Sequence, residues 1–350
     1  MVAFNQIPDD NLVPGTYAEF DKSQALQGDP TKPHRGLIIG IVPADSDIEK
    51  NTPVPVRSEA EVLEKAGKSS LAGAAYGWFR RNRRVEVHAI AIEEPDAGVA
   101  AKATIEITGT ATEDGVLPIY LNGVRIQVGV SEGDEPEDVY STIEDAINDA
   151  IDRNPYLLPF SVTANVDDVE IECAFKGIIG NDNTLRVAIG PRDKVPAGLE
   201  VNDTDFTGGD GSIDDADAVA AMGDTRYDTI AAGIDANSVS ALIDHLASQW
   251  GAKVQKDGLA VLGMTGSHGT VTTILDAINT PYVAVVPTNG SPTPPWVWAG
   301  QIAGADALKP DTPRPRRGMA LPDCAPPPES ERWDHDERNL VLQSGGGTFT

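Results

Sequence analysis

Residues 36–42 read Gly-Leu-Ile-Ile-Gly-Ile-Val, an apolar run with no polar side chain. Such a run predicts a β-strand in a sheet that is covered on both faces. A sheet covered in this way belongs to a layered fold of strands and helices. The run therefore favours an α/β architecture over an all-β or all-helical one.

The segments around this strand support that architecture. Ser58 is placed to cap a helix through Lys65 that Gly67 ends, and a second helix is expected at about residues 71–79. Strands are then expected at 85–92, 227–233, 259–264 and 282–287, and helices at 239–250 (capped by Ser238), 271–278 and 296–307. Strands that alternate with helices predict a mostly parallel sheet.

Residues 101–207 have a different character. Asn122-Gly123 separates two strand-like runs and is the strongest hairpin signal of the chain. Asp134-x-x-Glu137 is expected to be the capping box of a helix that ends at Asn154. Further strands are expected at 103–108, 160–164, 169–174 and 184–189. We interpret this stretch as an inserted β-rich (α+β) module.

The predicted organisation is therefore discontinuous. Residues 1–35, punctuated by prolines, are expected to be an extended N-terminal arm with a short strand at 16–20. Residues 36–100 and 208–350 are expected to form the α/β core, with a flexible joint at Gly208–Ser212.

The end of the chain carries further expectations. Residues 309–328 are rich in proline and arginine and are expected to be extended, and 339–343 is β-like. The last residues resemble the middle of a hairpin, so we expect the core to lack its C-terminal part.

The charge balance excludes some partners. The chain has 54 acidic and 27 basic residues, a net charge of −27. Such a surface repels nucleic-acid phosphates and anionic lipid headgroups, and no stretch has the 18 apolar residues that would indicate a membrane helix. We therefore expect no nucleic-acid partner, no direct membrane insertion and a salt-dependent association of subunits. A halophile-like surface is an alternative explanation of the charge.

Acidic residues are concentrated in residues 132–172, where Arg153 is the one basic residue. This stretch is either a solvated face or the outermost part of an assembly. Against this background, the run Arg80, Arg81, Arg83 and Arg84 is a candidate contact to acidic surfaces of neighbouring subunits, with plain surface arginines as the alternative.

Motifs that would carry chemistry are weak. Gly67-Lys68-Ser69 lacks the remaining residues of a phosphate-binding loop, and residues 203–214 match a calcium loop poorly. The loop Gly263–Gly269, which contains Ser267 and His268, lies between a predicted strand and helix and leaves open an α/β enzyme that binds a phosphorylated ligand. A glycan-binding module is a third, weaker alternative. The histidine and cysteine spacings indicate no metal site and no disulfide framework, so we expect no cofactor.

Blocks of the sequence, taken in order, resemble the contractile tail sheath proteins of phages, in particular the Mu-like group. The blocks are Phe4-Asn5-x-Ile7-Pro8, residues 13–21, residues 55–71, Ser291-Pro292-x-x-Pro295-Trp296-x-Trp298-Ala299 and Glu337-Arg338-Asn339-Leu340. The module near Ala103–Ile189 is similar to the inserted domain common in that family. The resemblance covers essentially the whole chain.

The resemblance implies a structural subunit of the virion and no enzymatic activity. It implies stacked hexameric rings around an inner tube, terminal arms that add strands to neighbouring sheets, and contraction that drives the tube through the host envelope. The implied partners are other sheath subunits, the tube protein, and baseplate and tail terminator proteins, assembled in the bacterial cytoplasm. The candidate subunit-interface residues are Val13, Tyr17, Glu19, Phe20, the four arginines, Leu340 and Leu342.

Overall fold

The computed structural model describes residues 34–190, 192–308 and 318–348. Residues 1–33 of the expected N-terminal arm, including its strand at 16–20, lie outside these residues, and Arg35, which was assigned to the arm, is instead the first residue of a strand of the core. The elements of the first and last parts are β1 (Arg35–Val42), β2 (Val54–Val56), α1 (Glu59–Ala66), α2 (Ser70–Arg81), β3 (Glu86–Glu93), α4 (Ala216–Met222), β11 (Thr229–Gly233), α5 (Ser240–Gln249), β12 (Leu259–Thr265), α6 (His268–Ile278), β13 (Val283–Thr288), α7 (Pro295–Ala307), η2 (Glu329–Glu331) and α8 (His335–Gln343).

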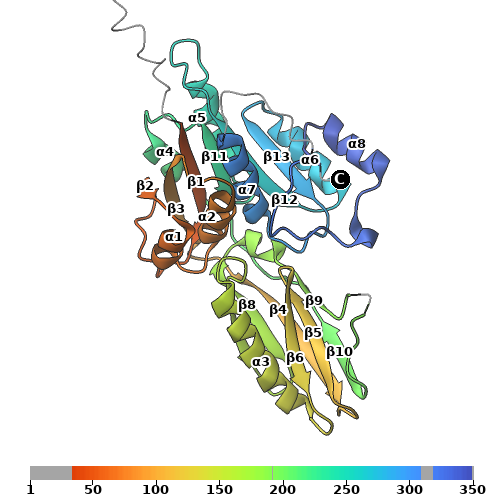
Figure 1. The fold of residues 1–350 in the computed structure, drawn as a ribbon. Coiled ribbons are helices and arrows are strands. Elements are labelled where there is room, and N and C mark those ends of the chain that lie inside the picture. Colours follow the sequence, from red (N-terminus) through yellow and green to blue (C-terminus); the bar gives the residue numbers. More distant parts are fainter. Residues whose placement is uncertain (1–33, 191, 309–317, 349–350) are drawn as a thin grey trace, which may run out of the picture. The chain divides into compact units, whose positions relative to one another are not determined.

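These parts share one six-stranded sheet, in the order β13-β12-β11-β1-β3-β2 (Figure 1). All neighbouring pairs are parallel except β2 with β3, as predicted from the alternation of strands and helices. β1 lies inside the sheet, and Leu37, Ile38 and Ile39 are at most 1% exposed. The apolar run that predicted a doubly covered strand is therefore at the centre of the core.

Local signals set the helix boundaries near β1. The hydroxyls of Ser58 and Ser69 accept hydrogen bonds from backbone N–H groups in the first turns of α1 and α2. Gly67 ends α1 with a φ of 64°, a conformation that favours glycine because it has no Cβ. Both helices were predicted here, and their existence is confirmed.

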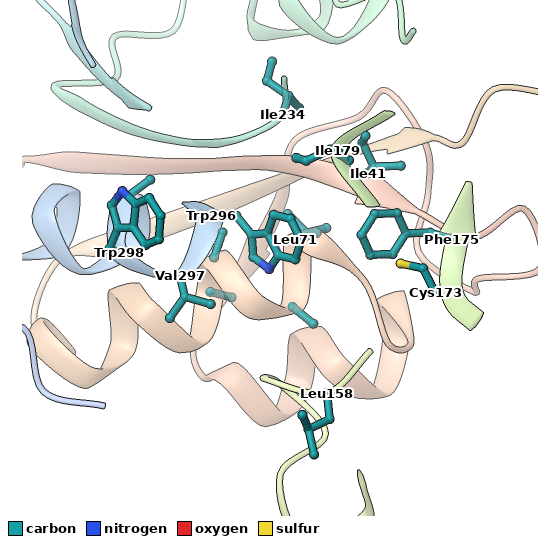
Figure 2. Close-up of a cluster of buried hydrophobic side chains, with 14 of the residues drawn as sticks. Ile41, Leu71, Leu158, Cys173, Phe175, Ile179, Ile234, Trp296, Val297 and Trp298 are labelled. Atoms are coloured by element: carbon teal, nitrogen blue, oxygen red, sulfur yellow. The ribbon is translucent and has the colours of Figure 1, made fainter. Parts of the chain in front are cut away.

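Helices α2 and α7 cover one face of the sheet and cross each other closely (Figure 1). Gly77 and Gly300 lie at the crossing, where an added Cβ would be 2.1 Å from a backbone oxygen of the opposite helix. α7 is buried along almost its whole length, including Trp296 and Trp298. Figure 2 shows Trp296 in one cluster with Leu71 and Phe175, and the rings of Phe175 and Trp296 meet edge to face at 5.9 Å.

The middle of the chain forms two further sheets, with strand orders β10-β4-β8-β7 and β6-β5-β9. Its elements are β4 (Ala100–Gly109), β5 (Gly115–Leu121), β6 (Val124–Val130), α3 (Pro136–Arg153), β7 (Phe160–Ala164), β8 (Val169–Lys176), η1 (Ile178–Asp182), β9 (Leu185–Val187) and β10 (Leu199–Asp203). α3 packs along β6 and β7 through an apolar face that includes Val139, Ile143 and Ile147 (Figure 1). The fold is thus an α/β core with a β-rich module.

Two turns of the module bear on the predictions. The Asn122-Gly123 hairpin is confirmed, and both residues have the positive φ that a two-residue turn of this kind needs. The predicted capping box is shifted by one residue: the helix begins at Pro136, and the backbone N–H of Glu135 donates to Asp138. Asp134 instead accepts from the backbone N–H of Ser131 in the preceding turn.

Three other expectations need correction. The β-like run 339–343 lies in helix α8, which starts with a capping box between Asp334 and Glu337. Ser238 does not cap α5; the carboxylate of the buried Asp215 accepts from the N–H groups of Ala241 and Leu242 instead. The expected joint at residues 208–212 is held on both sides by backbone hydrogen bonds, which join Asp210 to Val99 and Gly211 to Ile178. β2, β10, η1 and α4 were not predicted.

Candidate subunit-interaction surfaces

Arg80 lies on the last turn of α2 and is engaged within the chain. Its guanidinium is 2.6 Å from the carboxylate of Asp323, which also accepts from the Tyr76 hydroxyl at 3.2 Å. Burial, followed by the charge of Asp323, raises the pKa of Tyr76 to about 12. The Tyr76 ring stacks on that of Tyr156 at 5.1 Å. This cluster therefore connects α2 to the C-terminal segment and to the turn that follows α3.

Of the other three arginines of the run, one is paired within the chain and two are not. Arg83 pairs with Glu59 at the start of α1. Arg81 is half-buried and Arg84 is exposed, and neither forms an ion pair with a residue in the part of the chain that the structure describes. Arg81 and Arg84 are thus the members of the run whose charge stays available to another molecule.

Leu340 and Leu342 lie on α8 and are 47% and 54% exposed. Between them, Val341 is fully buried against α6, and the His268 ring is 3.0 Å from the carboxylate of Glu337. The helix therefore docks through Val341 and leaves both predicted leucines exposed to solvent. Val13, Tyr17, Glu19 and Phe20 lie outside the described residues.

The two edges of the six-stranded sheet differ in what they offer an incoming strand. β2 has three residues, and the central one, Pro55, has no N–H to donate. At the opposite edge, the carbonyl of Val285 on β13 already accepts from the N–H of Gly347. The β2 edge is therefore short and the β13 edge is partly paired, properties that sequence periodicity did not reveal.

A cavity of about 460 Å³ lies at the carboxyl end of β13. Its apolar lining includes Trp298, Met319, Leu321 and Trp333, and Thr288 and Asn289 line it from the sheet side. The charged residues that line it are Arg332 and Arg338. No single sequence motif pointed to this cavity, because its walls come from β13, α7 and the segment after residue 318.

The loop Gly263–Gly269, the basis of the enzyme alternative, has structural roles. The Ser267 hydroxyl caps α6 by accepting from the N–H of Thr270, and His268 faces Glu337 of α8. No group of three or more possible metal-ligating side chains occurs within residues 34–190, 192–308 and 318–348. Over the same ranges, none of the helices combines the length and apolar character that a bilayer crossing needs.

Comparison with known proteins decides what kind of protein has these surfaces. Residues 208–350 match the family model of the phage tail sheath protein central domain. The Mu-like prophage FluMu tail sheath protein of Haemophilus influenzae is 30% identical over 353 residues, an alignment that covers the whole of this chain and 71% of that protein.

The chain belongs to the phage tail sheath protein family. The resemblance identified from the sequence blocks is thereby confirmed, and so is the expectation that the protein is not an enzyme, since the family is structural. Tail sheath proteins are components of the virion.

Two solved structures of sheath tail proteins are also similar. The one from Desulfitobacterium hafniense has 13% sequence identity and a TM-score of 0.43, and the comparison covers 96% of this chain and 72% of the other. The one from Listeria innocua has 14% identity and a TM-score of 0.39, with 92% and 66% covered. Both TM-scores lie below 0.5, so neither structure supports a statement about the function of this chain.

Proposed function

We propose that this sheath protein polymerises as stacked hexameric rings around an inner tube, and that the sheath contracts to drive the tube through the host envelope. The observation that carries the proposal is the similarity to a tail sheath protein along the entire chain. Its partners would be neighbouring copies of itself, the tube protein, and baseplate and tail terminator proteins, with assembly in the bacterial cytoplasm.

The contacts between copies would be made by segments that have no core of their own. Residues 1–35 would act as an arm that adds a strand to a neighbouring subunit, because main-chain hydrogen bonds can persist while rigid bodies move. Among the described residues, four would also contact a neighbouring copy: Arg81, Arg84, Leu340 and Leu342. The two arginines form no ion pair within the described residues, and the two leucines are exposed.

The inserted module would occupy the outside of the sheath. Residues 101–207 contain the whole acidic stretch 132–172, and like charges repel least where neighbouring subunits are farthest apart. The core would then be residues 36–100 with 208–350. A net charge of −27 means that assembly should become easier as added salt screens this repulsion.

Deletion of residues 1–20 tests the arm. The truncated protein should stay folded, as measured by circular dichroism, and should lose the ability to form tubes seen by negative-stain electron microscopy. Full-length protein, handled in parallel, should form tubes. Tubes of normal appearance from the deletion would refute the arm, and single particles from the full-length protein at high concentration would refute the proposed function.

A further inference from the structure

Two unpaired cations lie at the cavity beside β13. Arg332 and Arg338 donate to the backbone carbonyls of Pro327 and Asp334, and neither forms an ion pair within the described residues. Acidic side chains are nearby in sequence but are used elsewhere: Glu331 pairs with Arg186 and Glu337 with His268. In a chain with twice as many acids as bases, two arginines left without a carboxylate need an explanation.

The cavity walls indicate what else an occupant would need. Trp298 and Trp333 present aromatic surface, and Met319 and Leu321 add aliphatic surface. The indole N–H of Trp333 is buried and has no hydrogen-bond acceptor within the described residues, which is a costly state for a polar group. A volume of about 460 Å³ lies within the range of about 300–1,000 Å³ typical of binding pockets.

These features fit a partner with large apolar side chains, with carboxylates beside them, and with a hydrogen-bond acceptor for the indole N–H of Trp333. One stretch of this sequence has that chemistry. Residues 4–21 contain Phe4, Tyr17 and Phe20 together with four acids, Asp9, Asp10, Glu19 and Asp21, and no base occurs before Lys22. Its net charge of −4 is opposite to that of the two arginines.

We infer that the cavity bounded by β13, α7 and residues 319–338 is the docking site for residues 4–21 of a second copy of this chain. Tyr17 or Phe20 would fill the apolar part, and Glu19 and Asp21 would pair with Arg332 and Arg338. The inference rests on the proposed function and gives the arm a specific receptor. A contact between two different surfaces is heterologous, and repeated heterologous contacts build rings or helical arrays.

The test measures binding of a fluorescent synthetic peptide of residues 4–21 to the full chain by anisotropy. We expect saturable binding that weakens with added salt, and a loss of at least about tenfold in affinity for the Arg332→Glu/Arg338→Glu variant. A peptide with Glu19→Lys and Asp21→Lys should bind this variant and not the unmodified chain. The matched control, Arg153→Glu/Lys253→Glu, makes the same charge change at two exposed sites away from the cavity and should leave peptide affinity unchanged.

Each result has a defined meaning. Absence of peptide binding, or equal binding by the unmodified chain and the cavity variant, overturns the inference. Failure of the charge-reversed peptide to bind the cavity variant, while circular dichroism shows that variant to be folded, also overturns it. Electron microscopy of the unmodified chain separates the two proposals: tubes without peptide binding remove only the docking site, and binding without tubes removes the proposed function.

Discussion

Gly300 lies where α7 crosses α2, and its replacement by alanine tests how tightly the core is packed. An added Cβ would be 2.1 Å from the carbonyl oxygen of Ala74 and 3.1 Å from the backbone nitrogen of Trp78. Carbon and oxygen atoms ordinarily approach no closer than about 3.3 Å, so the helices would have to separate by about 1 Å. Gly77 makes the same approach to Val297 from the other side, which leaves no free direction for relaxation.

The expected magnitude is a balance of two effects. Overpacking of a tight core costs about 1–3 kcal/mol, and the upper end applies here because both contacting atoms belong to helix backbones. Alanine in a helix interior gains about 1 kcal/mol over glycine. We therefore expect Gly300→Ala to lower the free energy of unfolding by about 2 kcal/mol, measured by urea denaturation followed by circular dichroism.

The matched control is Gly269→Ala in α6, where no atom lies within 4 Å of the added Cβ. This variant should be as stable as the original chain or more stable by up to about 1 kcal/mol, because only helix propensity acts on it. A Gly300→Ala protein that is equally or more stable than the original would refute the close packing of α2 against α7.

Two further predictions concern titratable groups whose pKa is raised by loss of solvent contact. Burial, with a smaller effect of Asp235, raises the pKa of the Asp182 carboxyl from its ordinary 3.8 to about 8. Between these two pH values, the folded chain therefore holds a proton that the unfolded chain has released. The free energy of unfolding should therefore fall as the pH rises from 4 to 8, and Asp182→Asn should reduce that slope; equal slopes in urea denaturation would contradict this. Burial also raises the pKa of the Cys173 thiol to about 12, so a thiol reagent at pH 8 should modify Cys173 only after denaturation. Rapid labelling of Cys173 in the native chain would count against this reasoning.

Predictions of the interaction surfaces were limited by long-range contacts. The arginine run was visible in the sequence, but Arg80 finds Asp323 at a separation of 243 residues. No local pattern tells which arginine of such a run is paired internally. The cavity beside β13 was missed for the same reason, since its lining residues come from three separate segments.

The features that could be predicted from the sequence are those that short-range chemistry controls. The apolar run 36–42, the serine caps of α1 and α2 and the Asn122-Gly123 turn are local, and each appears as predicted. The ordered blocks also sufficed to identify the family.

The remaining features depend on contacts between segments that are far apart in the sequence. Residues 339–343 are a β-like run in sequence, but the capping box and the burial of Val341 against α6 make them helical. The N–H groups at the start of α5 are satisfied by the carboxylate of Asp215, which immediately precedes α4. Hydrogen bonds and apolar contacts between distant segments outweigh local propensities of a few tenths of a kcal/mol per residue, and such contacts exist only once the chain has folded.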